Sequence, residues 1–523
     1  MRLQVGKNIL RQIKPLGRQQ QQPWRSKMVR CFSSSSSDRT LEDLHNEFRK
    51  EIAALPEIAA MENFEAFLIE KSHASNQNLE RWKHIAPPRP PPEGYTHVMA
   101  ADDILLTLDA AMATFALHVE SRIAALVGKG FYTIGPCGEE MLSAIGTSLE
   151  DYDDAALHYR HLGVSLARQL KRKGRSETVL RQLLLDRARG YTVSKLDPVT
   201  GGVHCSIGSH EGPGRDYLVT STLASQCPSA VGRALGYSVA AQQKVSTKKD
   251  DKQKPISFVS VGDGSVHNHH FWSAFHLARH ARHLNIQCPV VYGISNNGIS
   301  ISYETKDYVN TLFDHDPLIR SFHADGGDMM NVYDQTQQAT KYARQRSAPT
   351  VLLYQNITRR FGHAASDRQH AYLSAGQIQA MADSSVLERA IAQAVEVFNV
   401  CTYNEVKDRF AEIRTGTRQA FNQASTEAKV TREDMLEIVS QPMIACPRLP
   451  ASVVEKSGGN AITKETKTFS TSQKLEVMRK AMTRVLEESL ENEPSVVYIG
   501  EDVEHGGYYL VTDQVGQANQ LQS

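Results

Sequence analysis

Two short apolar segments, each followed directly by a polar turn, constrain the fold of this chain more than any other feature. Residues 256–261 and 289–295 are almost continuously apolar, as in parallel strands buried on both faces, and residues 271–282 between them have a helical pattern. A third such segment, 350–355, follows a helical stretch at 335–346. This alternation predicts an α/β fold with a doubly wound, mainly parallel sheet and helices on both faces.

The turns after the first two strands carry residues suited to binding a metal ion and a diphosphate. Gly262, Asp263 and Gly264 follow one strand, and Asn297 follows the next. Because such turns meet at one edge of a parallel sheet, we expect the oxygens of Asp263 and Asn297 to lie close together, where Mg²⁺ could bridge them to a diphosphate. The two glycines let the backbone approach the phosphates, and the next helix offers its N-terminal N–H groups.

Changes in composition divide the chain into segments. The first 37 residues are basic and serine-rich and contain no acidic residue, which is typical of a mitochondrial transit peptide; a disordered basic tail is the alternative. Prolines end the helical segment that follows. We expect a transit peptide at 1–37, a helical extension and proline-rich linker at 38–95, the diphosphate-binding α/β domain at 96–385, a helical tail at 386–446, a linker at 447–469 and the truncated start of a second domain at 470–523.

Charge and cysteine pattern argue against several classes of protein. A formal net charge of +1 gives no support for nucleic-acid or membrane-surface binding, and no stretch approaches the roughly 20 apolar residues that cross a bilayer. The seven cysteines form no CxxC pair, and their odd number argues against a disulfide framework. We therefore expect a soluble protein with reduced thiols and neither a nucleic-acid nor a membrane partner.

Several motifs, taken in order, resemble the alpha-type subunit of thiamine-diphosphate-dependent 2-oxo acid dehydrogenases of the branched-chain and pyruvate types. The likeness runs from about residue 128 to 372, and more weakly to about 445. The motifs are Gly138-Glu139-Glu140, His158-Tyr159-Arg160 before Gly163-Val164, the segment 221–232, Gly262-Asp263-Gly264, Asn296-Asn297-Gly298 and the loop 361–367. The resemblance implies the thiamine-diphosphate-binding fold.

The resemblance also implies roles for individual residues. Its cofactor-binding residues are Tyr159, Arg160, Ser221, Leu223, Gly262, Asp263, Gly264, Asn297 and Ile299. Among these, Asp263, Asn297 and the carbonyl of Ile299 correspond to the magnesium ligands, while Ser225 and Gln226 correspond to a potassium site of branched-chain members. His363 corresponds to a catalytic histidine, and His204 is either an active-site residue or a core histidine.

The segment at 499–507 resembles the beginning of the beta-type subunit of these enzymes. There a glutamate hydrogen-bonds N1′ of the cofactor's aminopyrimidine, and Glu501 stands at that position as a third catalytic candidate. The chain thus resembles the front of an alpha–beta fusion that ends early. This implies a need for a separate beta-type subunit or a missing beta-type domain, and an oligomer of the α₂β₂ kind.

The implied activity is oxidative decarboxylation of a 2-oxo acid in the mitochondrial matrix. Thiamine diphosphate provides the electron sink, and the acyl group passes to the lipoyl arm of an acyltransferase partner. Branched-chain substrates are favoured by the segments at 158–164 and 225–226, with pyruvate second. Two rivals remain open: a transketolase-like enzyme, which would lack the loop at 361–367, and a catalytically incomplete fragment.

A group of histidines near the first glycine-rich turn suggests a different metal site. His276 and His280 are spaced as on one helix face, but no cysteine or carboxylate nearby completes a zinc ligand set. A partly exposed helix face is the favoured interpretation, and Cys227 and Cys288 are interpreted as packing residues. Ala364 occupies the position of a regulatory phosphoserine in the two-subunit mitochondrial enzymes.

Overall fold

The computed structural model describes ten segments and a few further residues of the chain. The described residues are 39–73, 95–130, 134–198, 207–209, 216–219, 222–242, 254–305, 308–364, 367–440 and 477–492, with 496, 498–499, 511–512, 515 and 521–522. Internal contacts divide the chain into one unit of residues 1–235 and 253–435 and another of 236–252 and 436–523. The predicted transit peptide lies outside the described residues.

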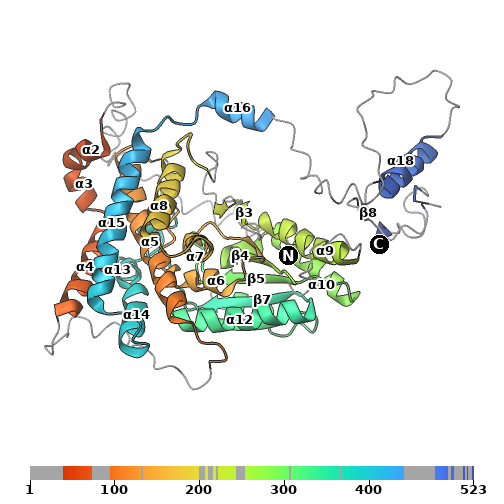
Figure 1. Ribbon diagram of the computed structural model, residues 1–523, viewed down its shortest axis with the longest axis horizontal. Helices are drawn as coiled ribbons and strands as arrows, with labels where there is room; N and C mark the ends of the chain where they lie inside the picture. The colour runs from red at the N-terminus through yellow and green to blue at the C-terminus, as the bar shows by residue number, and fades with distance from the viewer. Residues whose placement is uncertain are drawn as a thin grey trace, which may run out of the picture. The chain divides into compact units, whose positions relative to one another are not determined.

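The first unit is built on a sheet of seven strands, drawn in Figure 1. Its order is β2-β3-β1-β4-β5-β7-β6; β2 pairs antiparallel with β3 and every other pair is parallel. The strands are β1 (Asp154–Ala156), β2 (Ile207–Ser209), β3 (Asp216–Val219), β4 (Ser257–Gly262), β5 (Val290–Ser295), β6 (Arg320–Asp325) and β7 (Thr350–Gln355). The predicted α/β class is therefore confirmed, and β4, β5 and β7 coincide with the predicted strands to within one residue.

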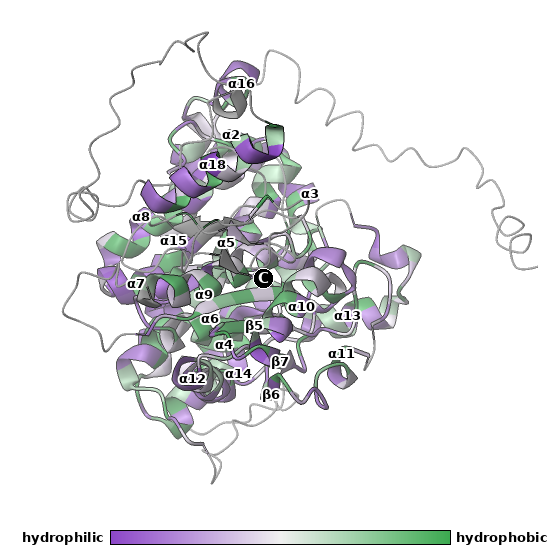
Figure 2. Cartoon of the chain, turned by 90° about the vertical axis from the view of Figure 1, so that its right-hand side faces the viewer, coloured by the Kyte–Doolittle hydropathy of each residue, from purple (hydrophilic) through white to green (hydrophobic). Residues whose placement is uncertain are grey.

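The central strands are apolar throughout because both faces of the sheet are covered. Along β7, Leu352 and Tyr354 belong to one hydrophobic core, whereas Val351 and Leu353 belong to the other. Since successive side chains of a strand point to opposite faces, a strand buried on both sides needs apolar residues at nearly every position. Figure 2 shows this hydrophobic colouring on the central sheet.

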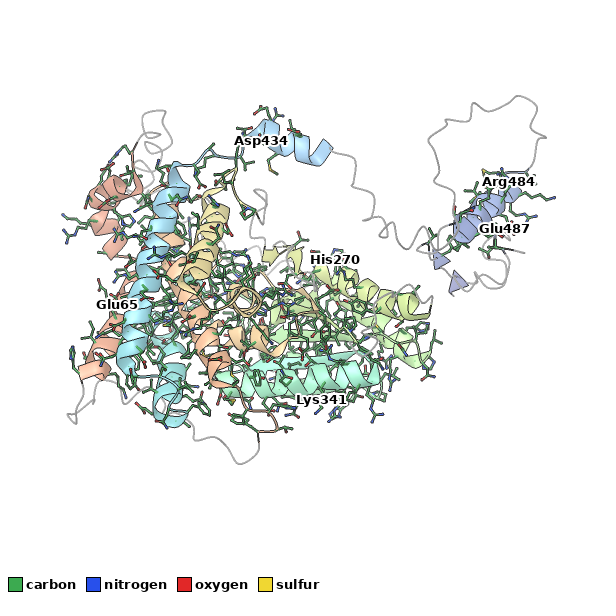
Figure 3. The ribbon with its side chains drawn as sticks, viewed as in Figure 1. Glu65, His270, Lys341, Asp434, Arg484 and Glu487 are labelled. Atoms are coloured by element: carbon green, nitrogen blue, oxygen red, sulfur yellow. The ribbon has the colours of Figure 1, made fainter. Side chains whose placement is uncertain are left out.

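Helices on the two faces complete the layers. The first core contains residues of α5, α6, α7 and α12, and the second contains residues of α9 and α10. Lys341 is exposed on α12, and Figure 3 labels it there. The bounds are α5 (Ala101–Leu126), η2 (Glu140–Leu142), α6 (Ser143–Ser148), α7 (Leu162–Lys173), α9 (Gln226–Gln242), η3 (Asp263–His267), α10 (His269–His283), α11 (Tyr308–Thr311) and α12 (Met329–Arg346).

Further helices complete the described structure: α4, α8, α14 and α15 pack against α5, and the helices at 41–73 and 387–440 lie in the predicted N-terminal and C-terminal extensions. α15 begins with a capping box in which Thr402 and Glu405 bond each other's backbone N–H groups. Its apolar face contacts α4, α5 and α8. These helices are α2 (Leu41–Glu47), α3 (Arg49–Ala53), α4 (Pro56–His73), α8 (Glu177–Thr192), η4 (Gln369–Ala371), α13 (Ala375–Asp383), α14 (Leu387–Ala392), the π-helix η5 (Gln393–Val397), α15 (Tyr403–Thr426) and α16 (Arg432–Ser440).

The expectation that no stretch of the chain is long and apolar enough to cross a bilayer is wrong for helix α5. It is long and apolar enough to cross a bilayer by length and composition, but 94% of its most apolar window is buried inside the fold. The α5 sequence is apolar along most of its length because the helix packs against α4, α6, α7, α8 and α15. It is therefore the central helix of the helical layer.

The second unit contains α18 (Met478–Asn492) and a parallel pair of short strands, β8 (Tyr498–Ile499) and β9 (Leu521–Gln522). The Thr483 hydroxyl donates to the carbonyl of Val511 at 2.7 Å, which ties α18 to the chain that follows it. Figure 3 places Arg484 and Glu487 on α18. The helix and strand predicted near 470–499 are present here, while Glu501 lies outside the described residues.

Candidate active site

A pocket of about 290 Å³ opens at the carboxyl ends of four adjacent parallel strands. The loop after β1 contributes His158, Tyr159 and Arg160, and the loop after β4 contributes residues 262–265. The loop after β5 contributes Asn297, Ile299, Ser300 and Ile301, and the loop after β7 contributes Arg359 and His363. This is the edge where parallel α/β sheets bind ligands, because strand ends and helix N-termini converge there.

Asp263 is a buried carboxylate at the end of β4. Its Oδ2 accepts a hydrogen bond from the Thr305 hydroxyl at 2.6 Å, and its Oδ1 accepts from the N–H of Gly264 at 2.9 Å. Burial raises the pKa of Asp263, and these two hydrogen bonds oppose the rise only in part. Both donors are neutral, so a bound cation would supply the charge that a buried carboxylate needs.

The loop after β5 is a tight turn that presents Asn297. Gly298 has a φ of +73°, which a side chain would strain, and the Asn297 Oδ1 accepts from the N–H of Ile299 at 3.0 Å. That bond uses one lone pair of the oxygen and leaves another for a ligand. A Cβ on Gly264 would lie 2.6 Å from the Ser300 hydroxyl oxygen, so the absence of a side chain lets the two loops approach.

His363 faces Arg160 across the pocket. The Arg160 Nη2 lies 2.8 Å from the His363 Nδ1 and donates to the His363 carbonyl at 3.1 Å. Since a guanidinium can only donate, Nδ1 is the acceptor and the proton of the neutral ring lies on Nε2. Burial, then the charges of Arg160 and Arg359, lower the pKa of His363 to about 4. The ring is therefore neutral at physiological pH.

A second set of polar contacts holds the loop that carries His363. Asp367 Oδ2 accepts from the backbone N–H of His363 at 2.7 Å and from the Tyr372 hydroxyl at 2.6 Å. Arg359 donates to that hydroxyl and to the carbonyls of Ser300 and Ile301. Arg359 thus joins the loops after β5 and β7.

The structure brings most of the predicted site residues together. Tyr159, Arg160, Leu223, Gly262, Asp263, Gly264, Asn297, Ile299 and His363 all line the pocket. Ser225 and Gln226 are not among its lining residues: the Ser225 hydroxyl donates to the Thr222 carbonyl, and the Gln226 amide donates to the Ser260 carbonyl. Ser221 and His204 lie outside the described residues, so their roles stay predictions.

Thr305 and Arg359 position the site and carry no role in the sequence-based prediction, and Glu139 is predicted there only as part of a motif, without a role. Thr305 bonds Asp263 directly, Arg359 joins two loops, and Glu139 lines the pocket. Arg359 could have been found from its place shortly after the predicted strand at 350–355. Thr305 carries no local pattern, because the contact depends on how the loop after β5 folds back.

The histidines of α10 form a partly exposed helix face, as interpreted. His276, His280 and His283 are exposed, and none of the α10 histidines belongs to a potential metal-binding group within the described ranges. His269 is also exposed and is not among the pocket-lining residues. Cys227 and Cys288 are fully buried free thiols, and burial raises the pKa of each to about 12, as expected for packing residues.

A doubly wound α/β sheet with a pocket at the carboxyl ends of its parallel strands belongs to the architecture whose members bind ligands at this edge. The family described as "Dehydrogenase E1 component" matches residues 114–433, which is more than half of the chain. The chain belongs to this family. The match ends before residue 470, so the predicted beta-type start at 470–523 stays a prediction.

Curated relatives are alpha subunits by name. The chain is 28% identical over 170 residues to the 2-oxoisovalerate dehydrogenase subunit alpha, mitochondrial, of Caenorhabditis elegans, covering 32% of this chain and 35% of the relative. It is 26% identical over 270 residues to subunit alpha 1 of the same enzyme in Arabidopsis thaliana, covering 48% of each. It is 27% identical over 234 residues to the pyruvate dehydrogenase E1 component subunit alpha of Rickettsia felis, covering 44% of this chain and 62% of the relative.

The matched regions span between about a third and three fifths of these relatives' own lengths. Both the branched-chain and the pyruvate type are represented among them. The family is therefore shown, and the choice between the two substrates is a separate question.

Proposed function

We propose that this chain is an alpha-type first component of a 2-oxo acid dehydrogenase that uses thiamine diphosphate and Mg²⁺. The observation that carries the proposal is the pocket at the ends of β1, β4, β5 and β7. There a buried Asp263 with neutral hydrogen-bond donors lies beside Asn297, and both line one cavity with Arg160 and His363. An oxygen-rich metal site next to a guanidinium fits a magnesium diphosphate.

The residues present suit this cofactor. Asp263, the Asn297 side-chain oxygen and the Ile299 carbonyl would hold the magnesium ion, and Tyr159, Arg160, Leu223 and the glycines of the β4 loop would line the diphosphate end. Thiamine diphosphate, when bound, supplies the electron sink that loss of CO₂ from a 2-oxo acid requires. Potassium at Ser225 and Gln226 remains part of the proposal.

His363 would act in this pocket as a neutral hydrogen-bond donor. Arg160 holds Nδ1 as the acceptor, so the proton on Nε2 is the one that the ring can donate to a substrate or acyl acceptor. Asp367 fixes the loop through the His363 N–H, which orients the ring. Arg160 therefore has two tasks, orienting His363 and placing positive charge in the pocket.

Branched-chain 2-oxo acids are the favoured substrates and pyruvate is the alternative. The partners would be a beta-type subunit or domain and a lipoyl-bearing acyltransferase, in an oligomer within the mitochondrial matrix. The mitochondrial names of the Caenorhabditis and Arabidopsis relatives support this location. Glu501 and His204 are proposed as further catalytic residues. The remaining alternative is a catalytically incomplete fragment that works only with a separate beta-type subunit.

Calorimetric titration of the full chain with thiamine diphosphate in the presence of Mg²⁺ tests this proposal. We expect magnesium-dependent binding that Asp263→Ala weakens by at least about 100-fold, since one metal ligand is removed. Asp408→Ala is the matched control, because Asp408 is exposed on α15 and does not line the pocket. Equal binding by the wild type and Asp263→Ala would contradict the site.

Adding a beta-type subunit separates the alternatives. A large gain in affinity, with decarboxylation of 3-methyl-2-oxobutanoate faster than that of pyruvate, would support a branched-chain alpha-type component. The reverse preference would support the pyruvate enzyme. Binding in none of these mixtures would contradict the cofactor assignment.

A further inference from the structure

Three buried side chains form a cluster beside the pocket wall. Glu139 comes just before η2, and His158 and His161 follow β1. Their exposed fractions are 5%, 4% and 1%, and one nitrogen or oxygen of each lies within 4.8 Å of those of the other two. Among the described residues, these three side chains form a group with the spacing of a metal site.

The cluster has polar atoms that its surroundings do not satisfy. Glu139 Oε2, His158 Nδ1 and His161 Nε2 are buried and make no hydrogen bond to any described residue. Glu139 Oε2 and His161 Nε2 lie 3.0 Å apart, but their geometry is not that of a hydrogen bond. An unsatisfied buried polar atom costs about 1–3 kcal/mol, so three in one place require an explanation.

Ser260 on β4 holds two members of the cluster in place. Its hydroxyl oxygen lies 2.8 Å from the His161 Nδ1 and accepts the backbone N–H of His158 at 2.8 Å. If the His161 Nδ1–H donates to Ser260, the bare lone pair of Nε2 points towards the Glu139 carboxylate. A cation between the two would remove their repulsion, and such an outer hydrogen bond is how metal-bound histidines are oriented.

We propose that Glu139, His158 and His161 bind a divalent ion of the zinc type, separate from the magnesium site. Two imidazoles and one carboxylate are a ligand set that zinc favours, whereas Mg²⁺ favours oxygen ligands such as Asp263 and Asn297. His158 is in the form that ligates metals, because burial and then the neighbouring His161 and Arg160 lower its pKa well below the ordinary value.

The geometry needs one small adjustment. Zinc bonds of about 2.0–2.1 Å place tetrahedral ligands about 3.3 Å apart, which the 3.0 Å between Glu139 and His161 nearly meets. The His158 ligand atom lies within 4.8 Å of the other two, so we expect metal binding to draw it closer. Glu139 and His158 line the pocket, so the fourth position of the ion opens towards it and takes water or a ligand oxygen.

Metal content measured on the full chain tests the site without using enzyme activity. The chain is incubated with Zn²⁺ in a large excess of Mg²⁺, desalted, and analysed by mass spectrometry for zinc. We expect one zinc per chain, and we expect Co²⁺ to replace it with the strong visible absorption of a four-coordinate site. A wild-type chain that retains no zinc overturns the proposal.

Variants identify the ligands. His161→Gln and Glu139→Gln should each weaken zinc binding by at least about 100-fold, because each removes one of three ligands. A His276→Gln/His280→Gln double variant on α10 and Asp263→Asn at the magnesium site should keep the zinc. Zinc retained by the cluster variants, or lost from the α10 variant alone, overturns the assignment.

A gain-of-signal variant guards against loss of binding through unfolding. In Co²⁺-loaded Glu139→Cys, a thiolate would take the place of the carboxylate and produce a near-ultraviolet sulfur-to-cobalt charge-transfer band. A merely structural role for Glu139 gives no such band. Absence of the band in a variant that keeps its circular dichroism and binds Co²⁺ also contradicts the proposal.

Discussion

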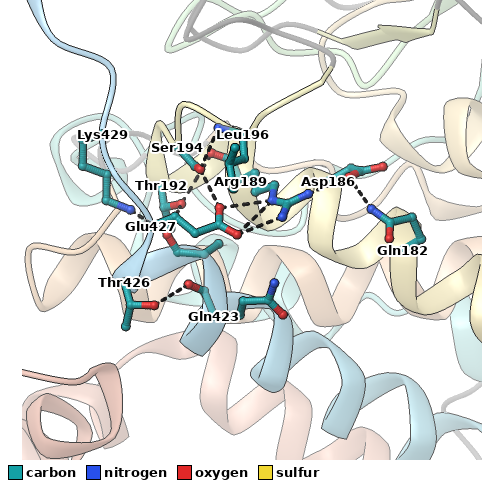
Figure 4. A network of polar contacts seen from close by, with 11 residues as sticks. Gln182, Asp186, Arg189, Thr192, Ser194, Leu196, Gln423, Thr426, Glu427 and Lys429 are labelled. Carbon is teal, nitrogen blue, oxygen red and sulfur yellow. Dashed lines mark hydrogen bonds and ion pairs between the residues drawn. The ribbon is translucent and has the colours of Figure 1, made fainter.

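Two carboxylates of this protein, Asp263 in the pocket and Glu427 at the end of α15, have opposite electrostatic surroundings. Figure 4 shows Glu427 accepting hydrogen bonds from the Arg189 guanidinium of α8 and the Ser194 hydroxyl. Although burial acts to raise it, these contacts lower the pKa of Glu427. The Thr305 hydroxyl and the Gly264 N–H that donate to Asp263 are neutral, and burial raises the pKa of Asp263.

A similar contrast exists between Asp109 in the helical layer and the cluster of Glu139, His158 and His161 beside the pocket. In the helical layer, Asp109 of α5 is 1% exposed and is bound by both Arg175 and Arg409, so three segments are joined around a neutralised charge. Around the pocket, the Glu139, His158 and His161 atoms lack hydrogen-bond partners in the described residues. Charges that hold a fold together are paired within the chain, whereas a binding site keeps polar atoms for its ligand.

The largest expected effect comes from breaking the paired charge in the helical layer. Asp109→Ala leaves two arginines without their buried partner and should lower the free energy of unfolding by about 3–5 kcal/mol. Urea denaturation measures this change, with Asp408→Ala on α15 as the exposed control that should shift it by less than about 0.5 kcal/mol. An equally small change in the free energy of unfolding for both variants would contradict a stabilising role for the paired charge of Asp109.

A smaller loss is expected at the α8–α15 junction. Glu427→Gln keeps the shape of the side chain but removes the charge that Arg189 and Ser194 bond, so we expect about 1.5–3 kcal/mol of destabilisation. Thermal unfolding measures this loss of stability, and thiamine diphosphate binding should stay unchanged. A loss of binding without loss of stability would mean that this junction belongs to the functional region.

Thr305→Val tests the other side of the comparison. The change removes the hydroxyl that bonds Asp263 at nearly constant volume, so the pKa of Asp263 should rise further. We expect magnesium-dependent thiamine diphosphate binding to weaken about 10-fold, with a loss of stability of about 1 kcal/mol from the removed hydrogen bond. Isothermal titration at several pH values measures this, and the loss should be greatest at low pH. Unchanged binding would show that Thr305 does not support the metal ligand.

A pH dependence of stability is also expected from His363. Its pKa is about 4 in the folded protein against 6.5 for an ordinary histidine, so between these values the unfolded chain takes up a proton that the folded chain does not. The free energy of unfolding therefore falls as the pH falls from about 6.5 to about 4. His363→Gln should show a shallower fall in denaturation experiments across that window. Identical pH profiles for the two proteins would contradict the neutral state of the buried His363 ring at a pH between about 4 and 6.5.

The sequence by itself determined the three central strands β4, β5 and β7 and predicted that Asp263 and Asn297 follow neighbouring strands. Strands buried on both faces, such as β4, β5 and β7, are apolar at nearly every position, and the ends of parallel strands meet at one edge. By contrast, β6 is an edge strand with exposed polar residues between buried ones, so its pattern did not stand out.

Tertiary structure alone decided the contacts that give the site its chemistry. Arg160 and His363 are 203 residues apart, and their 2.8 Å contact fixes the proton of the histidine on Nε2. The Thr305 hydroxyl on Asp263 and the meeting of Glu139 with His161 likewise depend on how loops from different strands pack. Local sequence patterns report burial and backbone geometry, whereas distances between side chains from separate loops are set only when the whole core has packed.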